Sequence, residues 1–132
     1  MCKPHALATP GRRLSTTRYG DVPAYITKDG CEIRELMHPE QHGNRHQSLA
    51  EAIVRPGQST RLHRHTRSEE LYHVTQGSGL MTLDKESFPI GVGDTVLIVP
   101  GTPHCVAACG SQPLHLLCCC SPAYSHEDTE LL

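Results

Sequence analysis

The sequence predicts an all-β protein built as a single domain. Nine short segments rich in β-branched or other apolar residues follow one another, turn-forming Gly, Pro, Asn and Asp separate them, and no segment keeps the period of a helix. The chain of 132 residues lies within the usual size of one domain. Many short strands without helices between them favour an antiparallel sandwich or barrel over a parallel α/β sheet.

The predicted strands occupy the middle of the chain. The first twenty residues combine Pro, Gly, Ser, Thr and Arg without a sustained period, so we expect 1–20 to form a flexible or loosely docked arm. Asp29-Gly30 predicts a tight reversal between the first two strands. Residues 122–132 are expected to form a C-terminal tail after a barrel at 21–121. Within that barrel we predict strands at 24–27, 32–36, 48–54, 60–65, 70–76, 79–83, 95–99, 105–108 and 114–120.

Charge and hydrophobicity narrow the function classes. Twelve basic and fourteen acidic residues give a formal net charge of −2, and no basic run could follow a phosphate backbone, which argues against a nucleic-acid partner. No stretch approaches the roughly 18 apolar residues of a membrane-spanning helix. The first fourteen residues are polar and contain Pro, unlike a secretory signal. We therefore expect a cytoplasmic protein.

The seven cysteines are predicted to be thiols. Their number is odd, and Cys118, Cys119 and Cys120 are consecutive, which suits a reducing compartment better than a disulfide framework. Neighbouring residues of a strand point to opposite faces, so the triplet could not jointly hold one metal ion. We interpret these residues, like Cys105 and Cys109, as small apolar side chains of strands.

Four polar residues are candidates for metal ligands. His63 and His65 are separated by one residue on a predicted strand, so both imidazoles lie on the same face. Glu70 follows after a turn-like segment, and His104 comes after a Pro-rich turn further along the chain. Nitrogen and oxygen ligands of this kind suit one divalent ion of iron, manganese, nickel, zinc or copper.

A second group of histidines carries a weaker signal. His38, His42 and His46 would align on a helix, but Pro39 and Gly43 interrupt it. We expect this segment to be a polar loop, with a secondary metal or substrate contact as the alternative.

Two blocks of the sequence resemble the motifs of the cupin superfamily, over residues 54–120. The first block is Gly57-x5-His63-x-His65-x4-Glu70-x6-Gly77. The second runs from Gly93 to His104, and fifteen residues separate Gly77 from Gly93. This resemblance implies a jelly-roll barrel, a double-stranded β-helix, in which the two motifs supply the ligands of one metal ion and leave open coordination positions. Val99 and Ala108 depart from the second motif, but neither is a ligand position.

The alternation of a strand also selects a candidate catalytic residue. If Glu70 faces the interior, Tyr72 faces it too, whereas Leu71 points outward. Tyr72 could hydrogen-bond a bound substrate or could simply fill a core that is poor in aromatic rings. In the tail, Tyr124 alternates with His126 and Asp128, and this segment could fold over the barrel mouth as a lid.

Two functions remain open from the sequence. The first is a metal-dependent enzyme that acts on a small molecule, of dioxygenase or isomerase type, because the ligand set suits Lewis-acid or dioxygen chemistry. The run from Pro56 to Glu69 also resembles the cupin part of bacterial mannose-6-phosphate isomerases. The second is a non-catalytic cupin that binds or senses a small ligand. A homodimer is expected, because the outer face of the barrel needs a cover.

Overall fold

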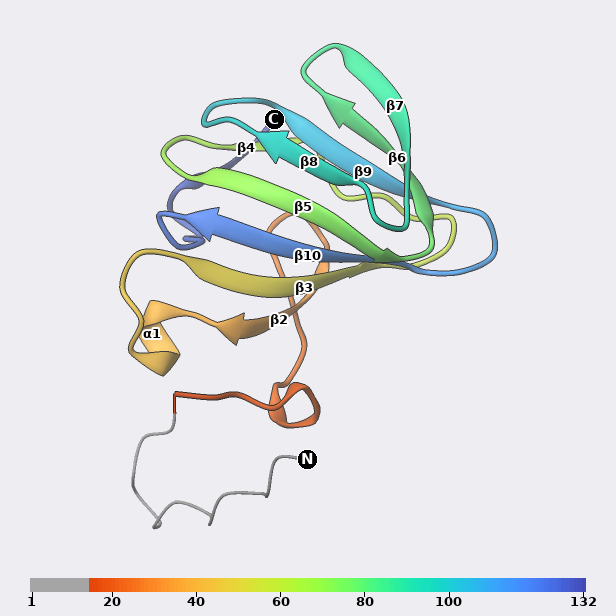
Figure 1. The fold of residues 1–132 in the computed structure, drawn as a ribbon. Helices are drawn as coiled ribbons and strands as arrows, with labels where there is room; N and C mark the ends of the chain where they lie inside the picture. Colours follow the sequence, from red (N-terminus) through yellow and green to blue (C-terminus); the bar gives the residue numbers. More distant parts are fainter. Residues whose placement is uncertain (1–14) are drawn as a thin grey trace.

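The structure is a computed structural model that describes residues 15–132 (Figure 1). Its strands form a six-stranded sheet in the order β1-β2-β3-β10-β5-β8 and a five-stranded sheet in the order β11-β4-β9-β6-β7. The strands are β1 Tyr25–Ile26, β2 Glu32–Met37, β3 Ser48–Val54, β4 His63–His65, β5 Glu69–Gln76, β6 Ser78–Leu83, β7 Glu86–Gly91, β8 Thr95–Ile98, β9 His104–Cys109, β10 Leu114–Ser121 and β11 Thr129–Leu131.

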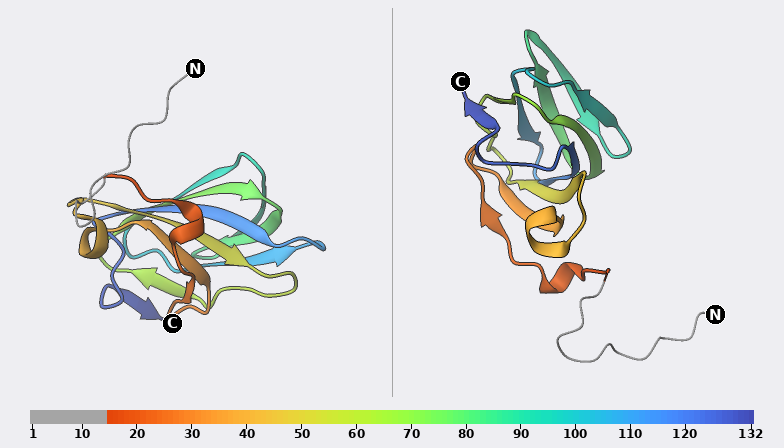
Figure 2. Two further views of the ribbon diagram at one scale, coloured as in Figure 1. Left: turned by 90° about the horizontal axis from the view of Figure 1, so that it is seen from below. Right: turned by 90° about the vertical axis from the view of Figure 1, so that its left-hand side faces the viewer.

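The chain passes repeatedly from one sheet to the other. From β3 onward, β3, β5, β8 and β10 belong to the larger sheet, whereas β4, β6, β7, β9 and β11 belong to the smaller one. All strand pairings between the described residues are antiparallel. Figure 2 shows the two sheets facing each other. This arrangement is a jelly roll, so the predicted all-β fold is confirmed.

Inward-facing apolar side chains form a core between the sheets. On β5, Leu71 is exposed while Tyr72 and Val74 are buried, which confirms the predicted alternation. Val74 and Leu116 of the larger sheet belong to one hydrophobic cluster with Met81 of the smaller sheet. Burying a side chain of this size stabilises the fold by about 1.5–3 kcal/mol, so this cluster holds the two sheets together.

Some elements differ from the sequence prediction. The structure adds β7 and β11, and it shortens the strands predicted at 24–27 and 60–65. β7 contains Pro89, which is tolerated because β7 is an edge strand. The segment predicted as a polar loop contains a short helix, α1, over Pro39–His42. No helix among the described residues is long and apolar enough to cross a membrane.

The described part of the N-terminal arm packs against the larger sheet. Residues 1–14 lie outside the described residues. The hydroxyl of Thr17 donates a hydrogen bond to the carbonyl of Leu36 at 2.6 Å, and the Arg34 guanidinium lies over the Tyr19 ring at 5.1 Å. Tyr19 begins a single turn of 3-10 helix, η1, over Tyr19–Asp21. Residues 15–20 are therefore a docked segment.

Strands form on both sides of the two sequence motifs, before Gly57 and after His104. The predicted reversal at Asp29-Gly30 joins β1 to β2, and Gly30 has the positive φ of 86° that such a turn favours. At the other end of the chain, β11 pairs with β4 (Figure 2). The barrel therefore extends beyond residue 121, where the sequence analysis ends it, and the expected tail is reduced to the connection before β11.

Candidate metal centre

Three buried histidines converge at one end of the barrel interior. His63 and His65 come from β4, and His104 begins β9, where it pairs directly with His63. One nitrogen of each ring lies within 4.8 Å of the nitrogens of the other two. The ring centroids of His63 and His104 are 4.2 Å apart. These three histidines could hold a metal ion, as their spacing in the sequence predicts, and we call them the metal cluster.

Backbone carbonyls orient two of the three rings. The Nδ1 of His63 lies 2.7 Å from the carbonyl oxygen of Arg61, and the Nδ1 of His104 lies 2.9 Å from that of Thr102. A carbonyl only accepts, so Nδ1 carries the proton in both rings and Nε2 is the free nitrogen. Hydrogen bonds of this kind commonly fix the tautomer and the direction of a ligating imidazole.

The third ring is oriented by a residue of β11. The Nδ1 of His65 lies 3.0 Å from the hydroxyl of Thr129, and that hydroxyl donates to the carbonyl of Ser125 at 2.9 Å. The ammonium of Lys28 donates to the carbonyl of Thr129 at 2.8 Å and so ties β11 to the turn after β1. Thr129 had no signal in the sequence, because its role depends on a strand pairing that spans 64 residues.

Glu70 lies beside two of these rings. Its Oε1 is 3.3 Å from Nε2 of His65 and 3.4 Å from Nε2 of His104, while its Oε2 accepts a hydrogen bond from the Cys120 thiol at 3.1 Å. Burial would raise the pKa of Glu70, but interactions with the nearby His104 and His65 outweigh burial and lower the pKa to about 2. The carboxylate is therefore ionised at neutral pH.

The polar atoms of this site fit a divalent cation. Oε1 of Glu70 and Nε2 of His104 are buried and have no hydrogen-bond partner of good geometry. Burial, followed by the nearby His104, lowers the pKa of His63, so this ring is neutral and its Nε2 is a lone-pair donor. Unpaired buried atoms are costly in a folded protein, and a cation bound to them would remove that cost.

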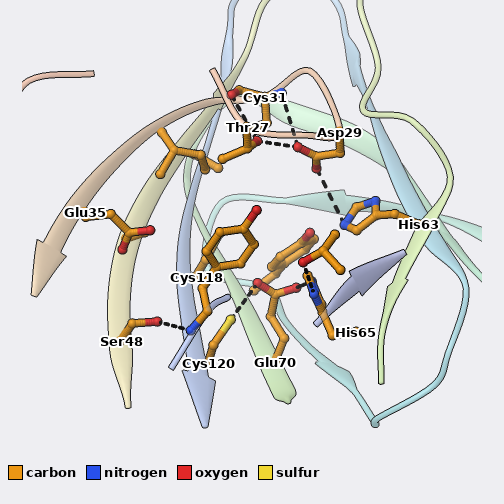
Figure 3. Close-up of a pocket in the computed structure, with 16 residues that line it drawn as sticks. Thr27, Asp29, Cys31, Glu35, Ser48, His63, His65, Glu70, Cys118 and Cys120 are labelled. Carbon is orange, nitrogen blue, oxygen red and sulfur yellow. Dashed lines mark hydrogen bonds and ion pairs between the residues drawn. The ribbon is translucent and has the colours of Figure 1, made fainter. Parts of the chain in front are cut away.

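Asp29 adds a second carboxylate that the sequence analysis assigned only to a turn. Its Oδ2 is 3.5 Å from Nε2 of His63. Its other oxygen, Oδ1, accepts hydrogen bonds from the Thr27 hydroxyl and, at 3.3 Å, from the backbone N–H of Cys31. These bonds hold the side chain toward the metal cluster (Figure 3). The β1–β2 connection, which contributes Thr27, Asp29 and Cys31 to the cavity wall, brings it there.

A cavity of about 490 Å³, including its open mouth, extends from the metal cluster along the larger sheet (Figure 3). Two neighbouring rows of inward-facing residues cross that sheet. The Tyr72 row consists of Tyr72, Cys118, Ala50 and Glu35, which face one another across β5, β10, β3 and β2. The Val74 row consists of Val74, Leu116, Ala52 and Ile33 on the same strands. All four residues of the Tyr72 row line the cavity.

Tyr72 lies in the cavity wall close to the metal cluster. Its ring centroid is 6.0 Å from that of His104, in an edge-to-face arrangement. Burial, followed by the charge of Glu70, raises the pKa of Tyr72 well above its usual value. The phenol therefore stays protonated at neutral pH and can donate a hydrogen bond into the cavity.

Of the three tail residues, one reaches the cavity. Tyr124 lines it, with its ring centroid 5.9 Å from that of His65. Asp128 instead accepts hydrogen bonds from the backbone N–H groups of Arg67 and Ser68, at 2.9 and 3.0 Å, and His126 is exposed. Movement of this segment as a lid stays a prediction.

The second group of histidines is apart from the metal cluster. His38 caps α1 by accepting from the N–H of Glu40, and its Nε2 donates to the carbonyl of Tyr124 at 2.8 Å. His42 accepts from the N–H of His38 at 2.9 Å. These contacts give His38 and His42 structural roles, whereas His46 is exposed.

Comparisons with known proteins agree with this geometry. The family described as "Cupin domain" matches residues 50–120. The Methanocaldococcus jannaschii protein MJ1618 is 52% identical over 120 residues, which cover 91% of this chain and 96% of that protein. The polyketide synthase CurC of Streptomyces cyaneus is 30% identical over 108 residues, which cover 78% of this chain and 70% of CurC.

A solved structure extends the similarity to three dimensions. The polyketide cyclase RemF of Streptomyces resistomycificus superimposes with a TM-score of 0.72 at 25% sequence identity, covering 82% of this chain and 79% of that one. The family match includes both histidines of β4, Glu70 of β5 and His104 of β9. The chain therefore belongs to the cupin family.

Proposed function

We propose that this protein is a metal-dependent enzyme that transforms a small molecule inside the barrel. The observation that supports it most directly is the convergence of three buried imidazoles and an ionised carboxylate at the end of a cavity. Two atoms of this group, Oε1 of Glu70 and Nε2 of His104, have no hydrogen-bond partner. Buried polar atoms without partners destabilise the folded state, unless a bound ion pairs with them.

Each ligand has a role in this proposal. His63, His65, His104 and Glu70 hold one divalent transition metal, which when bound would polarise a substrate oxygen or activate dioxygen. Tyr72, the proposed catalytic residue, donates a hydrogen bond to the bound substrate. The apolar walls exclude water, which strengthens such interactions.

The reaction class that we favour is proton transfer of the isomerase type. The carboxylate of Asp29 can accept a proton, and the phenol of Tyr72 can donate one. The two residues lie on different elements, and both are close to the metal cluster. The lining residues that the structure describes include no Arg or Lys, so a sugar phosphate, as in mannose-6-phosphate isomerases, is a poor fit. A dioxygenase-type reaction is the second candidate, because the lining of the cavity is largely apolar.

Metal binding is the first test of this proposal. The purified protein, loaded with Mn²⁺, Fe²⁺, Ni²⁺ or Zn²⁺ and dialysed, should retain about one ion per chain by elemental analysis. The variant with both His63→Ala and His65→Ala should retain less than a tenth of that. His73→Ala is the matched control, because His73 lies on β5 but is exposed on the outer face. Stoichiometric metal in the double variant would show that the site lies elsewhere.

A second measurement separates the reaction classes from a binding module. Candidate small acids and phenols are incubated with metal-loaded protein in deuterated water, with NMR and an oxygen electrode as readouts. Proton transfer should exchange substrate hydrogens for deuterium without oxygen uptake, whereas a dioxygenase should consume oxygen. Tight binding of a compound that undergoes neither change would favour the alternative, a cupin that binds or senses a small ligand.

The expected homodimer stays a prediction. Leu49, Leu71 and Leu97 are partly exposed on the outer face of the larger sheet. They lie on β3, β5 and β8, within one continuous sheet. An apolar outer face of this kind supports pairing of two copies.

A further inference from the structure

The far wall of the cavity carries a polar group that the proposed metal chemistry does not use. Glu35 is only 5% exposed and lines the cavity from β2 (Figure 3). Its Oε1 accepts a hydrogen bond from the Tyr25 hydroxyl at 2.8 Å, but its Oε2 is buried without a partner. A buried unpaired carboxylate oxygen costs about 1–3 kcal/mol or more, which makes it a marker for a missing binding partner.

The strand register places Glu35 opposite the metal side of the cavity. The Tyr72 row runs from Tyr72 on β5, next to the metal cluster, through Cys118 and Ala50 to Glu35 on β2. Neighbouring strands are about 4.8 Å apart, so three steps separate the backbones of Tyr72 and Glu35 by roughly 14 Å along the sheet. A molecule held at the metal can therefore reach Glu35 only by lying across this row.

Small side chains between the two ends leave room for such a molecule. The inward residues of the two central strands that line the cavity are all small: Ser48, Ala50 and Ala52 on β3 and Cys118 and Cys120 on β10. Larger side chains at these positions would fill the interior, because β-strand side chains project directly from the sheet. The floor of the cavity is thus a strip of small side chains with the metal cluster at one end and Glu35 at the other.

The protonation of Glu35 narrows the chemistry of its partner. Burial raises the pKa of Glu35, and the hydrogen bond from Tyr25 lowers it only in part. When protonated, Oε2 can donate, and when ionised it can only accept. A hydroxyl group both donates and accepts, so it pairs with Oε2 in either state, whereas an ammonium group pairs only with the ionised form.

We infer that Glu35 binds a hydroxyl group of the substrate, which is a largely apolar molecule with a metal-binding oxygen at its opposite end. This inference rests on the proposed function and specifies its substrate class. Glu35 acts here as a specificity-determining residue, since it contacts the substrate away from the reacting atoms. The hydrogen bond should favour a hydroxylated molecule about tenfold over its analogue without the hydroxyl, because a net hydrogen bond contributes roughly 1–1.5 kcal/mol.

Two compounds that differ only in that hydroxyl test the inference. Zn²⁺-loaded protein is titrated calorimetrically with 6-hydroxy-2-naphthoate and with 2-naphthoate, whose carboxylates can reach the metal. The unmodified chain should bind the hydroxylated compound about tenfold more tightly. Glu35→Met keeps the length of the side chain but removes both oxygens, and it should bind the two compounds equally. Glu35→Gln keeps an amide that donates and accepts, and it should restore most of the preference.

The controls separate this inference from the proposed function. Glu86→Met, in an exposed position of β7, should keep the full preference for the hydroxyl. Metal content is measured on the same samples. Metal-loaded protein that shows no preference, that binds neither compound, or that keeps the preference in Glu35→Met would overturn the inference while the metal proposal stands. Loss of metal from the unmodified chain would instead count against the proposed function.

Discussion

The Tyr72 row and the Val74 row cross the same four strands two residues apart, yet they differ in packing on β5 and β10. The Val74 row contains Val74 and Leu116, which are fully buried and belong to the hydrophobic core. The Tyr72 row has Tyr72 and Cys118 at the corresponding positions, and both line the cavity, as do Ala52 and Ile33 of the Val74 row. The cavity therefore ends against Val74 and Leu116, so the side chains on β5 and β10 determine where the packed core begins.

The largest expected effect comes from shortening the core row. Leu116→Ala should lower the free energy of unfolding by about 2–5 kcal/mol, because it leaves a void among packed side chains. Cys118→Ala should lower it by less than about 1 kcal/mol, because that side chain already borders the cavity. Urea unfolding followed by circular dichroism measures both. Equal losses would show that the two rows do not differ in packing.

A smaller effect is expected when the polar end of the Tyr72 row is changed. Tyr72→Phe should reduce turnover by about tenfold or more, since a positioned hydrogen-bond donor contributes about that much. Its metal content should equal that of the unmodified chain. Tyr19→Phe is the control, because Tyr19 lies outside the barrel on the docked arm. Full turnover in Tyr72→Phe would assign Tyr72 to packing, the alternative that its sequence position leaves open.

Glu35, at the other end of the row, should destabilise the fold at neutral pH. Burial raises its pKa above the ordinary value of 4.5, although Tyr25, His38 and His42 oppose the shift. The folded state therefore binds the proton more tightly than the unfolded state, so the contribution of Glu35 to stability is present below pH 4.5 and is lost as the pH rises through the folded pKa.

Glu35→Gln removes this titration. Its free energy of unfolding should equal that of the unmodified chain near pH 4 and exceed it increasingly above pH 5, by about 1.4 kcal/mol for each unit by which the pKa is raised. Thermal unfolding at a series of pH values measures the difference. A variant that is uniformly less stable would mean that Glu35 is fully satisfied in the folded protein.

The smallest effect is expected from reductant. The six cysteines of residues 15–132 are free thiols. Cys118 belongs to the Tyr72 row, and Cys120 follows it on β10. Burial raises the pKa of both thiols, so both stay protonated. Adding dithiothreitol should change the Tm by less than about one degree. A decrease of many degrees would contradict the thiol prediction and the expected cytoplasmic location.

The sequence was sufficient to predict the part of the site that depends on local spacing. His63 and His65 share a face because they are two apart on a strand, and Glu70 and Tyr72 do so for the same reason. Motif spacing then predicts His104, which the structure brings to the same point.

The rest of the site depends on contacts between distant strands. Thr129 reaches His65 through the β11–β4 pairing, and Asp29 reaches His63 through the turn after β1. The position of Glu35 follows only when the register of β2, β3 and β10 is known. A strand pattern shows which residues share a face but does not show which strands are neighbours, so these residues could not be predicted from the sequence.

The small side chains of β3 and β10 have a consequence for the evolution of the family. The candidate metal ligands lie on β4, β5 and β9, whereas five of the residues that line the cavity lie on two other strands, β3 and β10. Replacing Ala50 or Cys118 by Val or Leu would shorten the accessible space without changing a ligand or a backbone hydrogen bond. Selection can therefore change which molecules enter the cavity while the candidate metal ligands stay constant, and laboratory evolution of new specificities should begin at these positions.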